Sequence, residues 1–141
     1  MRLLALLPLV ALALVPAASA GTTKPCLLVT TDDAAKVLGG KVGAGKAQTL
    51  GLYKSCFYKR GTKTLTVQTR LIAKAAFEKS AKKNPPPVFP IPGIGQEAFS
   101  VGGGAALLVW QKGTELTFLF VGVNPFVQTQ KDLASAALKR L

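Results

Sequence analysis

The chain opens with an apolar run and continues with short segments whose apolar positions alternate or recur at helical spacing. The run from Leu3 to Val15 follows Met1-Arg2 and precedes the small residues Ala18-Ser19-Ala20. A basic start, an apolar run and a small-residue site are typical of a secretory signal peptide. The run is shorter than the about 20 residues that span a bilayer. We therefore expect residues 1–20 to be cleaved and residues 21–141 to be one exported domain, periplasmic or extracellular, with no transmembrane segment.

In the first half, a short polar lead is followed by a helical pattern and then by alternating segments. The helical pattern is entered from Cys26-Leu27-Leu28, with Thr30 and Asp33 as a capping box. It ends at Gly39-Gly40, because glycine favours helix ends. Three segments then follow, which we expect to be a weak strand or loop (41–52) and two strands (55–59 and 64–71) joined by a turn.

The second half repeats this order. Apolar spacing predicts a helix over 73–83 and a closing helix over 127–141. Strands are expected over 97–101, 105–111 and 116–123, the last two forming a covered hairpin with Trp110 in the core. The five prolines of 84–92 predict a rigid crossing without regular structure. We expect positive φ for Gly93 or Gly95 in the turn that follows.

The order is therefore helix, strands, helix, strands, helix. Strands joined by hairpins indicate a mainly antiparallel sheet flanked by helices, an α+β fold. The two halves read as a degenerate repeat of a helix followed by a small meander.

Charge is distributed unevenly along the chain. The 121 residues after the predicted cleavage site carry 17 basic and 6 acidic residues, a net charge of +11. Between Lys41 and Lys83, eleven cations face a single acid, Glu78. A polarised basic surface suits an anionic partner, such as lipid head groups, envelope polysaccharide or an acidic protein. The alternative is that the charge only maintains solubility. The candidate anion-binding residues are Lys41, Lys46, Lys54, Lys59, Arg60, Lys63 and Arg70.

Catalytic and cofactor chemistry finds little support. The chain has no histidine and only two cysteines, Cys26 and Cys56, which we expect to form a disulfide in an oxidising compartment. We therefore expect no metal, no cofactor and no catalytic residue. The segment 40–47 resembles a phosphate-binding loop, but Ala47 replaces its essential hydroxyl. Aromatic and basic residues interleave over 53–60, but in an exported protein we do not expect nucleic acid as the partner.

Several of these segments together resemble a known group of proteins. They are Cys26-Leu27-Leu28-Val29-Thr30, Ser55-Cys56-Phe57-Tyr58, the turn from Pro92 to Phe99, and the Ala- and Leu-rich closing helix. The chain resembles small bacterial envelope proteins and lipoproteins of unassigned function, of the LpqN-like and PsbP-like α/β/α sandwich type. The resemblance implies a Cys26–Cys56 disulfide and a helix-flanked sheet, and it implies no catalytic residue. The lipid-attachment cysteine of such lipoproteins is missing, so membrane tethering is not implied.

These observations favour an exported, non-enzymatic binding or accessory protein of the envelope or periplasm. One alternative is an electrostatic binder of an anionic polymer or membrane surface through the basic first half. The other is a small enzyme of a type that the sequence does not reveal.

Overall fold

The computed structural model describes residues 21–141, so the predicted signal peptide lies outside the described residues. A seven-stranded antiparallel sheet with the strand order β1-β2-β3-β7-β6-β5-β4 forms the centre. Two meanders, β1–β3 and β4–β7, meet where β3 pairs with β7. The strands are β1 (Lys46–Leu50), β2 (Tyr53–Arg60), β3 (Lys63–Leu71), β4 (Val88–Pro90), β5 (Glu97–Val101), β6 (Ala106–Gln111) and β7 (Thr114–Val121). The predicted α+β fold is confirmed.

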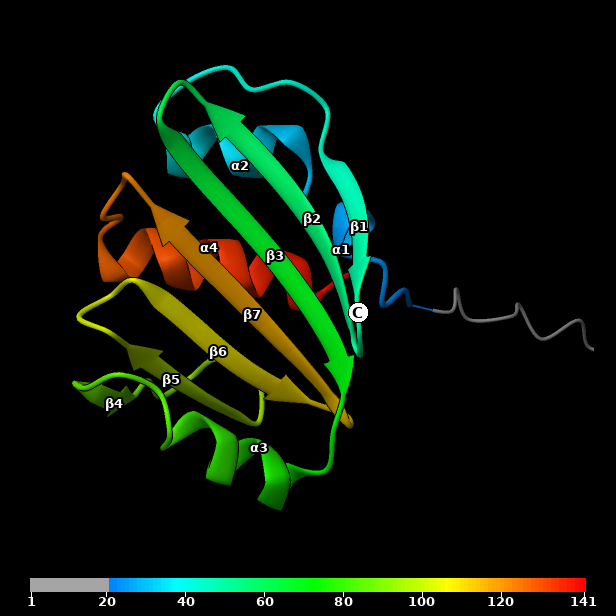
Figure 1. The fold of residues 1–141 in the computed structure, drawn as a ribbon, viewed down its shortest axis with the longest axis vertical. Coiled ribbons are helices and arrows are strands. Elements are labelled where there is room, and N and C mark those ends of the chain that lie inside the picture. The colour runs from blue at the N-terminus through cyan, green and yellow to red at the C-terminus, as the bar shows by residue number, and fades with distance from the viewer. Residues whose placement is uncertain (1–20) are drawn as a thin grey trace, which may run out of the picture.

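Helices cover the two faces of the sheet unequally. They are α1 (Pro25–Leu28), α2 (Thr31–Leu38), α3 (Lys74–Ala81) and α4 (Val127–Leu138). Figure 1 shows α2 and α4 passing behind the strands, while α3 lies beside β6 and β5 at the lower end. The larger core joins α1, α2 and α4 to the sheet through side chains such as Leu38, Phe118 and Leu133. On the other face, Phe77 of α3 packs with Phe99 and Leu108. No helix of residues 21–141 covers that face over β1, β2 and β3.

Local sequence signals set the helix ends. Thr30 and Asp33 form the predicted reciprocal capping box of α2, and Gly39 ends this helix at φ 81°. The expected single helix from Cys26 is divided, because Val29 and Thr30 are extended between α1 and α2.

Three two-residue turns fix the strand register. Gly51 and Gly61 have φ values of 59° and 60° at the first turn position, as a type II′ turn requires. Lys112 and Gly113 both have positive φ, as in a type I′ turn. Gly93 and Gly95 also have positive φ, which confirms the expectation for that turn.

The proline-rich segment was predicted wrongly. Residues 88–90 form β4, which pairs with β5 at the edge of the sheet. An edge strand accepts proline because one side of its backbone needs no ladder hydrogen bond. Trp110 also differs from expectation, because it is half-buried and donates from Nε1 to the Ile72 carbonyl at 2.8 Å.

Candidate functional site

The disulfide positions the N-terminal segment against the first strands. Cys26 of α1 is bonded to Cys56 of β2, which confirms the predicted pairing. Two residues further along β2, the buried Tyr58 hydroxyl donates to the Val29 carbonyl. Gly45 lies so close to this pair that a Cβ would stand 2.4 Å from Cys56 Sγ and 2.7 Å from the Tyr58 ring. The start of β1 is thus held beside the disulfide and α1.

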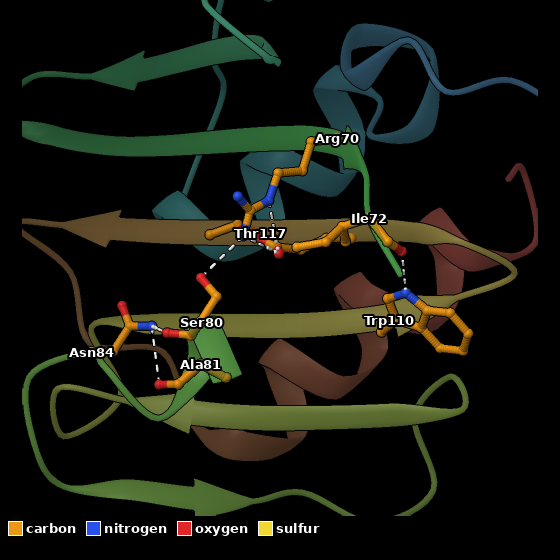
Figure 2. Close-up of polar contacts among 8 residues, drawn as sticks. Arg70, Ile72, Ser80, Ala81, Asn84, Trp110 and Thr117 are labelled. Atoms are coloured by element: carbon orange, nitrogen blue, oxygen red, sulfur yellow. Dashed lines mark hydrogen bonds and ion pairs between the residues drawn. The ribbon is translucent and has the colours of Figure 1, made fainter. Parts of the chain in front are cut away.

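A polar cluster lies on the opposite face, between β3, β7 and α3 (Figure 2). Arg70 donates to Glu115 Oε2 from Nε at 3.0 Å and from Nη2 at 2.8 Å, and Nη2 also reaches Ser80 Oγ at 3.1 Å. Thr117 donates its hydroxyl to the other Glu115 oxygen at 3.0 Å. The Arg70 guanidinium also stacks 4.8 Å from the Tyr53 ring centroid. Both Glu115 oxygens therefore have protein donors.

This polar cluster acts as a structural tie. A small cavity of about 180 Å³ lies beside it and is lined by residues that include Tyr53, Ser80 and Asn84. Asn84 uses its amide to donate to the Ser80 and Ala81 carbonyls at the end of α3. Because the charged groups of the cluster bond to each other, the cluster connects α3 to the sheet. Few of its polar atoms are therefore free to bind a ligand or to react.

Two of the seven candidate cations, Arg70 and Arg60, form hydrogen bonds within the fold, and a third, Lys63, lies close to Arg60's contact at the end of α2. Arg70 belongs to the polar cluster. Arg60 donates from Nη1 to the Leu38 carbonyl at 3.4 Å, at the C-terminal end of α2, and its guanidinium packs against Gly40. The Lys63 amine lies beside Gly39 at the same helix end. Cations are favoured at this negative end of the helix dipole.

Three of the other four candidates lie on β1 or the neighbouring β2, and Lys41 lies in the loop that leads to β1. Lys41 precedes this strand, Lys46 begins it, and Lys54 and Lys59 lie on the neighbouring β2. All four are exposed, and none forms an ion pair with any of residues 21–141. Because Cys56 and Tyr58 face the helices, strand alternation places Lys54 on the helix side and Lys59 on the opposite side. Lys54 and Lys59 therefore lie on opposite faces of one sheet edge, so the candidates do not form one contiguous face.

Sequence reasoning missed a fifth cation, Lys24. It lines a groove together with α1, β1 and Lys54. The predicted disulfide could have identified Lys24, because Lys24 and Lys54 each lie two residues before a bonded cysteine. We define the basic edge as Lys24, Lys41, Lys46, Lys54 and Lys59.

Among residues 21–141 no acid forms an ion pair with the basic edge, and the sequence has no acid between Asp33 and Glu78. Burial raises the pKa of Glu97, and so do a hydrogen bond and charge repulsion from Glu78, while Lys74 and Lys82 oppose them. Burial acts in the same direction on Asp33, but hydrogen bonds from Thr30 and Arg140 outweigh it and lower the Asp33 pKa.

Residues 21–141 contain neither a metal-ligand cluster nor a membrane-spanning helix. Among residues 21–141 no three His, Cys, Asp or Glu side chains gather as metal ligands. Within the same residues no helix is long and apolar enough to cross a membrane.

Comparison with protein-family models, curated proteins and solved structures found no match, so the functional argument depends on the geometry of the chain itself.

Proposed function

We propose that the protein is an exported, non-enzymatic binding or accessory module that holds an anionic envelope component or acidic protein at the basic edge. The observation that carries this proposal is the lack of acidic partners for these five lysines among the described residues. Uncompensated charges of one sign create a local field that attracts ligands of the opposite sign. In contrast, Arg70 and Arg140 both have carboxylate partners.

Three further features are compatible with the proposal. The disulfide and the lack of a spanning helix in residues 21–141 fit an exported protein. The sequence has no histidine, and its two cysteines are bonded to each other. The buried Glu115 carboxylate is occupied by Arg70 and Thr117, which does not suit a general acid or base.

The test compares two triple charge reversals of equal net charge. One variant changes Lys46, Lys54 and Lys59 to Glu, and the control changes Lys79, Lys83 and Lys112, which are also exposed and in no ion pair with the described residues. Arg60 and Lys63 are left intact because Arg60 donates to the end of α2 and Lys63 lies beside it.

Retention on a heparin column and on anionic-lipid vesicles is measured as a function of salt. We expect the basic-edge variant to elute at clearly lower salt than the control, because removing contacts to an anion reduces salt-dependent affinity. Equal shifts for both variants would show that net charge alone decides retention, and would overturn the proposal.

A further inference from the structure

The two edges of the sheet differ in how they are protected against pairing. At one edge, β4 has three residues, contains Pro90, and follows Pro85, Pro86 and Pro87. At the other edge, all five residues of β1 are exposed, and no proline interrupts them. No strand of the described chain pairs with the outer side of β1. Proteins usually protect exposed edges with prolines, charges or bulges. Lysines are the protection that β1 has, and they would repel a basic strand but attract an acidic one.

The register identifies the backbone groups that β1 presents outward. Gly51 and Leu52 form a two-residue turn between the paired residues Leu50 and Tyr53. Such a turn is closed by a hydrogen-bonded pair, and bonded and non-bonded pairs alternate along an antiparallel ladder. Lys46, Gln48 and Leu50 therefore bond inward to β2, and the N–H and C=O groups of Ala47 and Thr49 point outward.

A groove runs beside this edge on the helix side. Its volume is about 580 Å³, and its lining includes Lys24 and Leu27 from the α1 end, Ala47 and Thr49 of β1, and Lys54 of β2. The Cys26–Cys56 disulfide holds α1 in place as one wall. Leu27 is 58% exposed and offers an apolar contact in the groove.

The charges indicate what kind of strand would fit. Lys24 and Lys54 lie on the helix side of β1, whereas Lys46 and Lys59 line a shallow hollow with Phe57 on the other side. Successive side chains of an added strand point to opposite faces. Acidic side chains on such a strand would reach cations on both faces, whereas a flat anionic membrane would meet one face only.

We propose that the outer edge of β1 binds an extended acidic segment of a partner protein as an eighth strand of the sheet. This inference rests on the proposed function and specifies its partner. The backbone of Ala47 and Thr49 would supply ladder hydrogen bonds, and the lysines on both faces would select for acidic residues. A five-residue strand extends over about 17 Å, so the segment needs only about five to seven residues.

Synthetic peptides test the proposal on the purified protein by fluorescence anisotropy at low and high salt. The probe is Glu-Val-Thr-Glu-Val-Thr-Glu, which places acids on both faces of a strand. One control replaces each Glu with Lys. A second control keeps the three Glu but is N-methylated at every inner residue, so that it has no inner backbone donors. We expect the acidic peptide to bind at least about tenfold more tightly than either control, and to slow hydrogen exchange at the Ala47 and Thr49 amides.

A pair of variants supplies an independent readout. Thr49→Pro removes one outward donor and should weaken binding of the acidic peptide, while Thr49→Ala should retain binding. If Thr49→Pro fails to fold, the N-methylated peptide still tests the backbone contribution.

Several results would overturn the inference. One is equal binding of the acidic and N-methylated peptides, which indicates charge attraction alone. A second is that the protein binds anionic vesicles or heparin but not the acidic peptide. A third is that the protein forms a dimer that Thr49→Pro abolishes. In each case the proposed function is judged separately, by whether heparin retention depends on the basic edge.

Discussion

At the residue scale, Gly43 and Gly45 lie in the same loop before β1 but differ in their surroundings. A Cβ on Gly45 would collide with Cys56 Sγ and the Tyr58 ring, whereas a Cβ on Gly43 would meet no atom within 4 Å. Neither glycine has positive φ, so steric contact alone separates them. We expect Gly45→Ala to lower the free energy of unfolding by about 1–3 kcal/mol, as overpacking does.

Gly43→Ala is the matched control for Gly45→Ala and should leave stability nearly unchanged. Urea denaturation of both variants measures the difference. Equal stabilities would mean that the loop can move away from the disulfide without cost.

Arg70 and Glu115 illustrate the cost of an uncompensated buried charge. The Glu115 side chain is 4% exposed and that of Arg70 is 16% exposed. Removing one partner of a buried ion pair costs about 3–5 kcal/mol, because the other charge stays buried. We expect Arg70→Ala to destabilise the fold by an amount in this range, measured by chemical denaturation.

Two comparisons make the Arg70 prediction specific. The double variant Arg70→Met/Glu115→Leu should recover most of the loss, because no buried charge remains. Lys74→Ala, which breaks the exposed pair with Glu78, should cost no more than about 0.5 kcal/mol. A double variant as unstable as Arg70→Ala would contradict this account.

The candidate anion-binding residues show what could not be predicted from the sequence at this scale. Composition correctly located the excess of cations in the first half, but it could not separate Arg60 and Arg70 from Lys54 and Lys59. The difference depends on tertiary partners, since Glu115 lies 45 positions from Arg70 and the Leu38 carbonyl lies 22 positions from Arg60. No local pattern reports such contacts.

At the scale of elements, the sequence predicted those features that depend only on residues close to each other along the chain. The capping box of α2, its glycine end and the alternation of β3 were all visible in the sequence. By contrast, β4 was missed because Pro90 and the three prolines before the strand argue against regular structure, and only the edge position makes Pro90 acceptable. The basic edge was likewise not predicted, because it depends on the order of the strands in the sheet, which the sequence did not specify.

The contact between α3 and β5 predicts a pH dependence. Burial and the neighbouring Glu78 raise the Glu97 pKa above its ordinary value of 4.5. The folded state therefore keeps a proton that the unfolded chain releases. Stability from this group is full below pH 4.5 and falls as the pH rises towards the folded pKa. Asp33 acts oppositely, because its pKa is lowered from 3.8, so its contribution is lost only in more acidic solution.

Glu97→Gln should therefore remove the decline in stability above pH 4.5 and raise stability at pH 7. Thermal unfolding between about pH 5 and pH 8 measures this effect, because most proteins are most stable in this window. Asp132→Asn, on the exposed surface of α4, is the control and should follow the wild-type profile. A Glu97→Gln profile with the wild-type slope would show that the Glu97 carboxyl does not hold the extra proton.

At the scale of the whole molecule, the two meanders share their stability. The junction pairs eight residues of β3 with β7, from Thr64↔Val121 to Leu71↔Thr114. The larger core joins first-half residues such as Leu65 to second-half residues such as Phe118 and Leu133. Arg140, which follows α4, also donates to the Leu28 carbonyl and to Asp33, both at 2.6 Å, and so connects the C-terminal segment to the first two helices. Neither meander can therefore lose its fold without exposing the core of the other.

This shared core predicts a single cooperative unfolding transition. Trp110 lies in β6 and reports on the second meander by fluorescence, while hydrogen exchange at β2 amides reports on the first. In a two-state protein, different probes give coincident transitions, so both should give the same denaturant midpoint and the same free energy of unfolding. The expectation holds for the oxidised protein, because the Cys26–Cys56 bond fixes α1 to β2. A lower midpoint for β2 than for Trp110 would show that the first meander opens independently. That outcome would place the basic edge on a unit that can separate from the rest of the sheet.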